Sequence, residues 1–161
     1  MSQKIGVLVN CPINEENREK LLNRFDLYFA EEVPDKNLLL KEIGNKIEII
    51  ISDGPRTIDA SLMDQLPNLK LICLQSVGID HLDIEVARER DIRVTNAAGT
   101  NAISCADQAF ALMLALYRNI VVNNKAMHEN KADEETSFTR TNTISGKKIG
   151  ILGLGMIGVE I

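Results

Sequence analysis

The feature that most constrains this chain is a GxGxxG motif at residues 153–158, directly after an apolar stretch at residues 149–152. An apolar strand that runs into such a turn and then into a helix is the fingerprint of a dinucleotide-binding unit. The motif alone also fits a glycine-rich turn that binds no ligand. Its position after an apolar stretch favours the dinucleotide-binding interpretation, because the motif requires that context.

Each position of the motif has its own physical role in this interpretation. Gly153 allows the tight turn, and Gly155 lets a pyrophosphate approach the backbone without a Cβ in the way. Gly158 lets the following helix pack close to the strand. The backbone N–H groups of Met156 and Ile157, at the start of that helix, would face the phosphate charge, which the helix dipole also favours. These five residues are the candidate cofactor-binding residues.

A complete dinucleotide-binding unit needs more residues than follow the motif here. It continues through a whole helix and a second strand to an acidic residue about 20 residues beyond the glycines. The sequence given ends at Ile161. We therefore expect a fragment that holds only the opening of a cofactor domain. We also expect its strand at residues 149–152 to have unpaired edges that invite association or disorder.

Charge and composition exclude several classes of protein. The formal net charge is −5 and no long Lys/Arg run occurs, so no nucleic-acid partner is expected. The longest apolar run, residues 109–117, is far too short to cross a bilayer, so no membrane partner is expected. Cys11, Cys73 and Cys105 are widely separated and form no CxxC motif, which suits a reducing cytoplasm and predicts neither disulfides nor a metal site.

Apolar stretches and predicted helices alternate through the first part of the chain. Strands are predicted at residues 4–10, 27–30, 47–52, 71–75 and 92–95, and helices at residues 15–25, 36–43, 59–66 and 84–90. The strong strands are apolar along most of their length rather than alternating, which indicates a sheet covered on both faces. This order predicts an α/β fold, a doubly wound parallel sheet.

The chain changes character after this unit. Residues 97–101 are typical of a crossing between domains. A helix is predicted from Ala102 to about Val122, with apolar residues nearly all round, so another domain or subunit should bury most of its circumference. The polar residues 123–146 follow, either as a mobile linker or as an arm that reaches a partner subunit.

Four segments in the later part of the chain carry a resemblance to a known family. They lie at residues 66–72, 76–83, 92–118 and 145–158, and they include Ser-Val-Gly-Ile-Asp at 76–80 and Cys-Ala-Asp at 105–107. In this order and at this spacing they resemble the D-isomer-specific 2-hydroxy-acid dehydrogenases. The two short sequences quoted resemble in particular the glyoxylate and hydroxypyruvate reductases of that family.

The resemblance implies a domain organisation and a reaction. Residues 1–99 would form a flavodoxin-like substrate-binding (lid) domain, and residues 100–161 would begin an NAD(P)-binding Rossmann domain. The reaction would transfer a hydride between NAD or NADP and a small 2-keto acid, such as glyoxylate or hydroxypyruvate, giving the D-2-hydroxy acid. The resemblance also implies a homodimer formed through residues 102–146.

The resemblance places a substrate site in the loop after the strand at residues 71–75. In such enzymes backbone N–H groups of this loop hold the substrate carboxylate, and the matching residues here are Val77 and Gly78. The placement agrees with physics, because open α/β sheets bind ligands at the carboxyl ends of their strands. Without the resemblance, a left-handed turn would be the better explanation of Gly78.

No catalytic residue is assigned. The family uses an Arg to polarise the carbonyl and a Glu-assisted His to protonate the forming alkoxide, and no residue before Ile161 matches either motif. The 161 residues alone are therefore expected to be inactive.

Two interpretations from other classes stand beside the enzyme. One is a non-catalytic module of the same fold that binds a small acid or a partner protein. The other is a receiver-like domain, which needs an acidic cluster with a phosphorylatable Asp at its strand ends. The first strand ends in Val9-Asn10-Cys11-Pro12, which supplies no such cluster.

Overall fold

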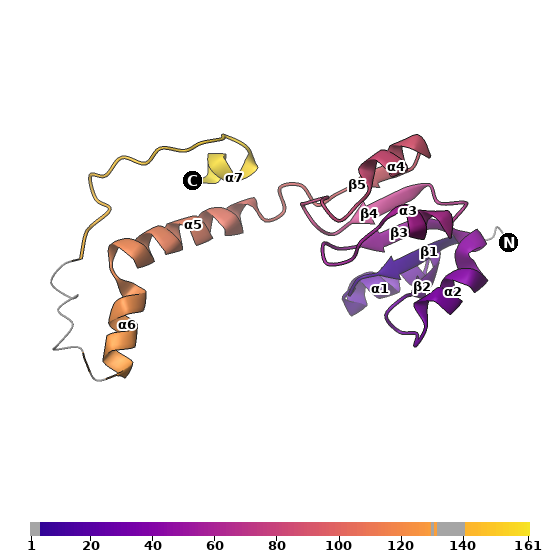
Figure 1. Cartoon of the computed structure of the whole chain (residues 1–161), viewed down its shortest axis with the longest axis horizontal. Helices are drawn as coiled ribbons and strands as arrows, with labels where there is room; N and C mark the ends of the chain where they lie inside the picture. Colours follow the sequence, from indigo (N-terminus) through magenta and orange to yellow (C-terminus); the bar gives the residue numbers. More distant parts are fainter. Residues whose placement is uncertain (1–3, 130, 132–140) are drawn as a thin grey trace. The chain divides into compact units, whose positions relative to one another are not determined.

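Five strands form one parallel sheet in a computed structural model that describes residues 4–129, 131 and 141–161 (Figure 1). Two compact units, Met1–Ala98 and Gly99–Ile161, make up the chain, and each is described by itself. The sheet lies in the first unit. Its strands are β1 (Ile5–Asn10), β2 (Phe25–Phe29), β3 (Ile47–Ser52), β4 (Leu71–Leu74) and β5 (Arg93–Thr95).

The strand order is β2-β1-β3-β4-β5, and every neighbouring pair is parallel. This is the flavodoxin-like order of a doubly wound sheet. The predicted α/β fold is therefore confirmed. The order reverses direction at β1, so the switch point of the topology lies between the carboxyl ends of β1 and β3, where such sheets bind ligands.

Four helices and a short 3-10 turn connect the strands. They are α1 (Glu15–Leu22), α2 (Lys36–Ile43), η1 (Gly44–Lys46), α3 (Ala60–Asp64) and α4 (Ile84–Glu89). Each α-helix begins after an Asn or Asp whose side chain accepts a backbone N–H of the first turn. The first helix was predicted to reach residue 25 but ends at Leu22, because Phe25 already pairs with Ile5 in the sheet.

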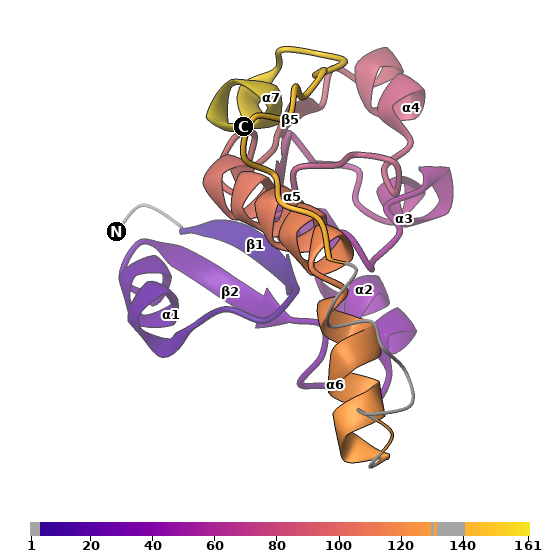
Figure 2. The same ribbon diagram turned by 90° about the vertical axis from the view of Figure 1, so that its left-hand side faces the viewer.

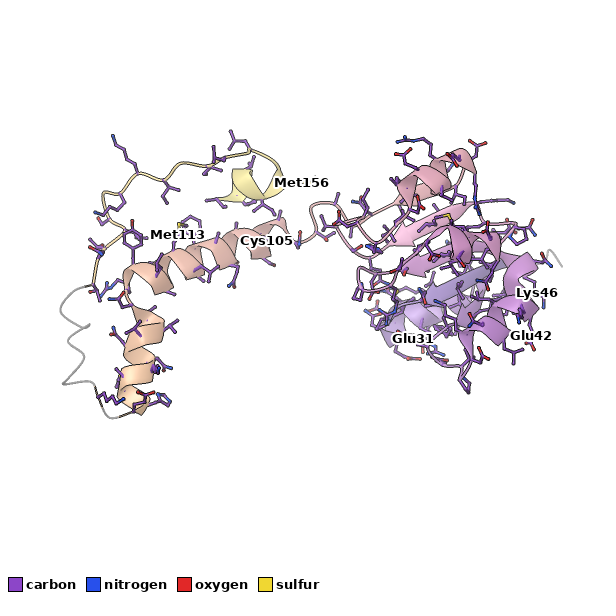
Figure 3. All side chains as sticks on the ribbon, viewed as in Figure 1. Glu31, Glu42, Lys46, Cys105, Met113 and Met156 are labelled. Carbon is purple, nitrogen blue, oxygen red and sulfur yellow. The ribbon has the colours of Figure 1, made fainter. Side chains whose placement is uncertain are left out.

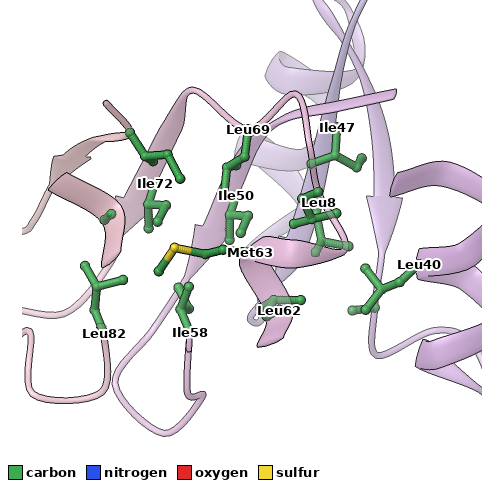
Figure 4. Close-up of a cluster of buried hydrophobic side chains, with 14 of the residues drawn as sticks. Leu8, Leu40, Ile47, Ile50, Ile58, Leu62, Met63, Leu69, Ile72 and Leu82 are labelled. Carbon is green, nitrogen blue, oxygen red and sulfur yellow. The ribbon is translucent and has the colours of Figure 1, made fainter. Parts of the chain in front are cut away.

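The core of the first unit lies on one face of the sheet (Figure 4). Leu8, Ile50 and Ile72 occupy paired positions on neighbouring strands, and all three are fully buried. Helices α2 and α3 cover them with further apolar side chains, Leu40, Ile43, Leu62 and Met63. Burial of this size, about 1.5–3 kcal/mol for each large side chain, is the main stabilising term of the unit.

The opposite face of the sheet is less completely covered by the described residues. Val9, Ile51 and Cys73 are paired there; Val9 is buried, whereas Ile51 and Cys73 are half-buried. Helix α1, which connects β1 to β2, contributes no buried residue. The predicted cover of both faces is therefore complete on one face and partial on the other, because apolar composition indicates that a strand prefers burial but does not determine which helices cover it.

The long apolar helix of the second unit is broken where one helix was predicted (Figure 2). Helix α5 (Ala102–Tyr117) ends at Arg118, and helix α6 (Ile120–His128) begins after Asn119, which adopts a left-handed conformation with φ of 51°. Asn tolerates this conformation better than most residues, which explains the position of the break. Among the described helices none is singly long and apolar enough to span a membrane; α5 and α6 together are, but they are bent by 60°.

The expected burial of this helix is not found among the described residues. In α5 only Ala102 and Ala106 are buried, and Leu116 is 75% exposed. The described residues of this single chain do not cover the helix, and burial of its circumference by another domain or subunit stays a prediction. The predicted arm at residues 123–146 lies partly outside the described residues.

No strand forms at residues 149–152 in the described part of the second unit, which corrects the sequence-based prediction. Leu152 is fully exposed, and Ile149 is also exposed. A strand exists only through hydrogen bonds to a neighbouring strand, and residues 141–148 and 153–161 supply none. The following helix, α7 (Met156–Glu160), does form.

Candidate functional site

The loop after β4 carries the two candidate substrate-binding residues. Val77 and Gly78 are both exposed, at the carboxyl edge of the sheet. Asn96 Nδ2 donates to the Val77 carbonyl at 2.8 Å, and Ser76 Oγ donates to the Gly78 carbonyl at 2.8 Å. Both carbonyls are thus held, and the peptide orientations are fixed by side chains from the ends of two strands.

The amide groups of this loop are left available. Among the residues that the structure describes, neither the Val77 nor the Gly78 N–H has a protein acceptor. Gly78 does not lie in the left-handed region, since the described glycines with positive φ are Gly99, Gly146 and Gly153. The left-handed-turn explanation of Gly78 therefore does not hold.

A second loop lies against this one. Gly54, after β3, stands beside Ser76, and a Cβ on Gly54 would lie 3.7 Å from the Ser76 Cβ. Arg56 follows in this loop and donates from Nη1 to Asp53 Oδ1 at 2.6 Å. Its Nη2 donates to Glu31, which follows β2. No role was predicted for these residues from the sequence, although an Arg three residues after an Asp at a strand end is a signal that could have found them.

Cys11 lies directly after β1, at the carboxyl edge of the sheet. Gln75 Nε2 donates to Cys11 Sγ at 3.3 Å. Burial and the negative charge of Asp53 raise the pKa of the Cys11 thiol to about 11, although Arg56 acts in the opposite direction. The thiol is therefore protonated at neutral pH and is not a nucleophile.

Two buried polar side chains tie β1 to β3 at the switch point. Asn10 Nδ2 donates to Ser52 Oγ at 3.4 Å, and Lys36 Nζ donates to Asn10 Oδ1 at 3.1 Å. Burial lowers the pKa of Lys36, which Asp59 partly offsets. These contacts fix the strand ends below the loops, because a buried polar group must keep its hydrogen bonds.

The five candidate cofactor-binding residues lie together in the second unit, at the start of α7. Gly153 has a φ of 97°, a conformation that other residues rarely adopt. A Cβ on Gly158 would overlap the Gly153 carbonyl oxygen, so only glycine lets α7 approach the turn this closely. Gly155 caps α7, and the space where its Cβ would be is open within 4 Å.

The conformation of Gly153 and the close approach at Gly158 agree with the roles predicted for the glycines of this turn. The open side of Gly155 gives a ligand access to the backbone, and the exposed Met156 and Ile157 follow it at the beginning of the helix. Figure 3 labels Met156 at the start of α7, and a Cβ on Gly99 would lie 2.8 Å from the Met156 Sδ. The two candidate sites belong to different units, Val77 and Gly78 to the first and the glycine turn to the second.

Other polar residues have structural explanations. Asp83 Oδ1 accepts the Val86 N–H at 3.2 Å and caps α4, as expected from its position. His81 is half-buried, and its Nε2 has no partner among the described residues. No group of three His, Cys, Asp or Glu side chains in the described part of the chain is arranged to hold a metal ion.

A flavodoxin-like sheet with two acceptor-free loop amides at its carboxyl edge, followed by a glycine turn that opens a helix, defines the class: an α/β protein with a glycine motif of the dinucleotide-binding type. The sequence model of the D-isomer specific 2-hydroxyacid dehydrogenase family, catalytic domain, matches residues 7–145. This chain belongs to that family.

Relatives and solved structures agree with this assignment. Glyoxylate/hydroxypyruvate reductase A of Arabidopsis thaliana is 35% identical over 159 residues, which cover 99% of this chain and 50% of the relative. The 2-hydroxyacid dehydrogenase of Ketogulonicigenium vulgare Y25 matches with a TM-score of 0.81 and 31% identity, over 99% of this chain and 50% of that one.

A third protein is known with ligands bound. The NADPH-dependent glyoxylate/hydroxypyruvate reductase of Sinorhizobium meliloti, in complex with NADP and malonate, matches with a TM-score of 0.76 and 26% identity, over 98% of this chain and 49% of that one. The chain thus spans about half the length of the relatives that it matches.

Proposed function

We propose that this chain is part of an oxidoreductase that transfers a hydride between NAD or NADP and a small 2-keto acid such as glyoxylate or hydroxypyruvate, giving the D-2-hydroxy acid. Its membership of the family and the names of its relatives support the reaction. Residues 1–99 would act as the substrate-binding (lid) domain, and residues 100–161 would begin the cofactor domain. Three cysteines without a disulfide suit our further proposal of a cytoplasmic location.

One observation supports the assignment of the substrate site. The Val77 and Gly78 amides are exposed and have no acceptor among the described residues, while their carbonyls are held by Asn96 and Ser76. Two neighbouring N–H groups without a protein acceptor suit a carboxylate, whose two oxygens can accept a hydrogen bond from each. Val77 and Gly78 would therefore orient the substrate by its carboxylate.

The glycine turn would hold the cofactor. Gly153, Gly155 and Gly158 would shape the turn around the pyrophosphate, and the N–H groups of Met156 and Ile157 would face its charge. The bound nicotinamide supplies or accepts the hydride. The open backbone at Gly155 supports this assignment, whereas the choice between NAD and NADP depends on a residue beyond the second strand of such a unit.

The third part of the proposal is a homodimer through residues 102–146. Exposed apolar side chains occur along α5 and α6, and a groove there is lined by Leu112, Ala115, Leu116, Asn119, Val121 and Val122. Apolar surface of this extent is typical of a protein interface.

The carboxylate site can be tested by substitution of Gly78. Valine at this position should weaken glyoxylate binding about tenfold or more, because a branched side chain obstructs the amide and a hydrogen bond to a charged group contributes about 1.5–3 kcal/mol. Glyoxylate titrations of the ¹⁵N-labelled chain, followed through the Val77 and Gly78 amide shifts, measure the affinity. Gly150→Val is the control, since its side chain would meet open space. Equal affinity in Gly78→Val would contradict the assignment.

We further propose that the 161 residues are inactive alone, because no residue takes the role of the carbonyl-polarising cation or the general acid. A positioned acid or base contributes about 10²–10⁴ in rate. The purified chain, mixed with NADH or NADPH and glyoxylate or hydroxypyruvate, should not change the near-ultraviolet absorbance of the reduced cofactor. Measurable turnover would show that catalytic groups do lie within these residues.

A further inference from the structure

Asp80 places a carboxylate beside the proposed carboxylate site. A Cβ on Gly78 would lie 3.3 Å from Asp80 Oδ2. Because a Cβ is about 2.5 Å from the nitrogen of its own residue, this oxygen lies within about 6 Å of the Gly78 nitrogen. Among the described residues no hydrogen bond joins the Gly78 N–H to the Asp80 carboxylate, so the two groups are neighbours that leave each other unpaired.

The contacts of Asp80 show no structural role for its side chain. In the part of the chain that the structure describes, its carboxylate accepts no hydrogen bond and forms no ion pair, and the residue is exposed. Asp83, three residues later, differs in this respect because it caps α4. The Asp80 oxygens are therefore available to a ligand, as are the two amides beside them.

The turn that carries Asp80 is held by backbone hydrogen bonds. The Leu82 N–H donates to the Ile79 carbonyl at 2.9 Å. From the loop after β3, the Ile58 N–H donates to the His81 carbonyl at 2.9 Å. These bonds fix the backbone on both sides of the carboxylate before a ligand binds, which lowers the cost of ordering the site.

The loop thus offers a ligand two N–H donors and one nearby carboxylate acceptor. A ligand that uses all three groups carries an anion for the donors and a hydroxyl for the acceptor. An anion without a hydroxyl only adds a second negative charge near Asp80, which is unfavourable. A hydroxyl offsets this repulsion, because its hydrogen bond to a charged oxygen is stronger than one to a neutral acceptor.

We propose that Asp80 is a specificity-determining residue, which favours 2-keto acids that carry a hydroxyl on the carbon beyond the carbonyl. The inference rests on the proposed function and deepens it, since the acid would be held by its carboxylate at Val77 and Gly78. Hydroxypyruvate has such a hydroxyl, whereas pyruvate is the same acid with a methyl group in place of the hydroxymethyl group. Both acids carry one negative charge, so the comparison isolates the hydroxyl.

The test titrates the ¹⁵N-labelled 161-residue chain with hydroxypyruvate and with pyruvate, followed through the Val77 and Gly78 amide shifts. The original chain should bind hydroxypyruvate about threefold to tenfold more tightly, the effect of one hydrogen bond. Asp80→Ala removes both the acceptor and the charge. Pyruvate should then bind about twofold to fivefold more tightly, hydroxypyruvate should bind no more tightly than before, and the preference should disappear.

A second variant separates the acceptor from the charge. Asp80→Asn keeps an oxygen that can accept the hydroxyl but removes the negative charge, so both acids should bind more tightly and the preference for hydroxypyruvate should remain. The matched control is Glu85→Gln, which removes the same charge from an exposed side chain that pairs with Arg88. It should leave both affinities within about twofold of the original values.

The possible failures can be told apart. If hydroxypyruvate moves the amides but binds no more tightly than pyruvate, or if Asp80→Ala keeps the preference, the role of Asp80 is overturned and the carboxylate site stands. If both Asp80 variants weaken both acids equally, Asp80 supports only the loop structure, and its role in specificity is again overturned. If neither acid moves the amides, the carboxylate site fails and this inference fails with it.

Discussion

Gly6→Ala should destabilise the first unit by about 3 kcal/mol, or prevent it from folding. Gly6 pairs with Asp26 on one side and Ile47 on the other, in the interior strand β1. A Cβ here would overlap the carbonyl oxygen of Lys46, a backbone atom of the turn that leads into β3. The obstacle is not a flexible side chain, so the strand pairing itself would have to shift.

Urea denaturation followed by far-ultraviolet circular dichroism measures this loss. Gly54→Ala is the matched control, because a Cβ there would meet the Ser76 Cβ at 3.7 Å, an ordinary contact. The control should stay within about 1 kcal/mol of the original chain. A fully stable Gly6→Ala variant would mean that β1 and the Lys46 turn are not as close as described.

Ile50→Ala should cost about 2–5 kcal/mol of unfolding free energy, a large fraction of the stability of a typical domain. Ile50 is fully buried at the centre of the sheet, paired with Leu8 and Ile72. Truncation would remove apolar contacts and leave a cavity between the sheet and α3, which the surrounding structure can fill only partly.

The graded control for this prediction is Ile50→Val, which removes one methylene and should cost about 0.5–1.5 kcal/mol. The same denaturation experiment compares the two variants. If both changes cost less than 0.5 kcal/mol, Ile50 does not pack in the core as described, and the assignment of this face as the interior of the unit would be wrong.

The sheet was predictable because its strands are locally encoded. The strand at residues 47–52 was predicted with the bounds that the structure shows, since an apolar, β-branched run there is closed by Asp53-Gly54-Pro55. The helix caps at Asn14 and Asp83 were also readable, because a cap is a contact between residues three positions apart. Local patterns of this kind decide which element forms and where it begins.

The errors arose where an element depends on distant partners. Residues 149–152 have a strand composition, but a strand needs a neighbour, and the described part of the second unit supplies none. The break at Asn119 also escaped, because the apolar periodicity on either side is continuous and one left-handed residue interrupts it. Apolar periodicity indicates which side chains prefer burial, but it does not show whether another part of the protein covers them.

The candidate site also has some features that could be predicted from the sequence and others that could not. A loop at a strand end and a glycine motif are readable from the sequence, and the resemblance to a family selected Val77 and Gly78 within that loop. The pairing of Arg56 with Glu31 was not readable, because the two residues are 25 positions apart and meet only where strands β2 and β3 end at one edge.

The sequence by itself determined the α/β alternation, the glycine turn and the family, since each depends on residues that are near one another in the chain. Only the tertiary structure decided the strand order, the availability of the loop amides and the pairing of Arg56 with Glu31. These depend on contacts between residues far apart in the chain, and hydrogen-bond geometry and exposure are properties of such contacts and not of any single segment.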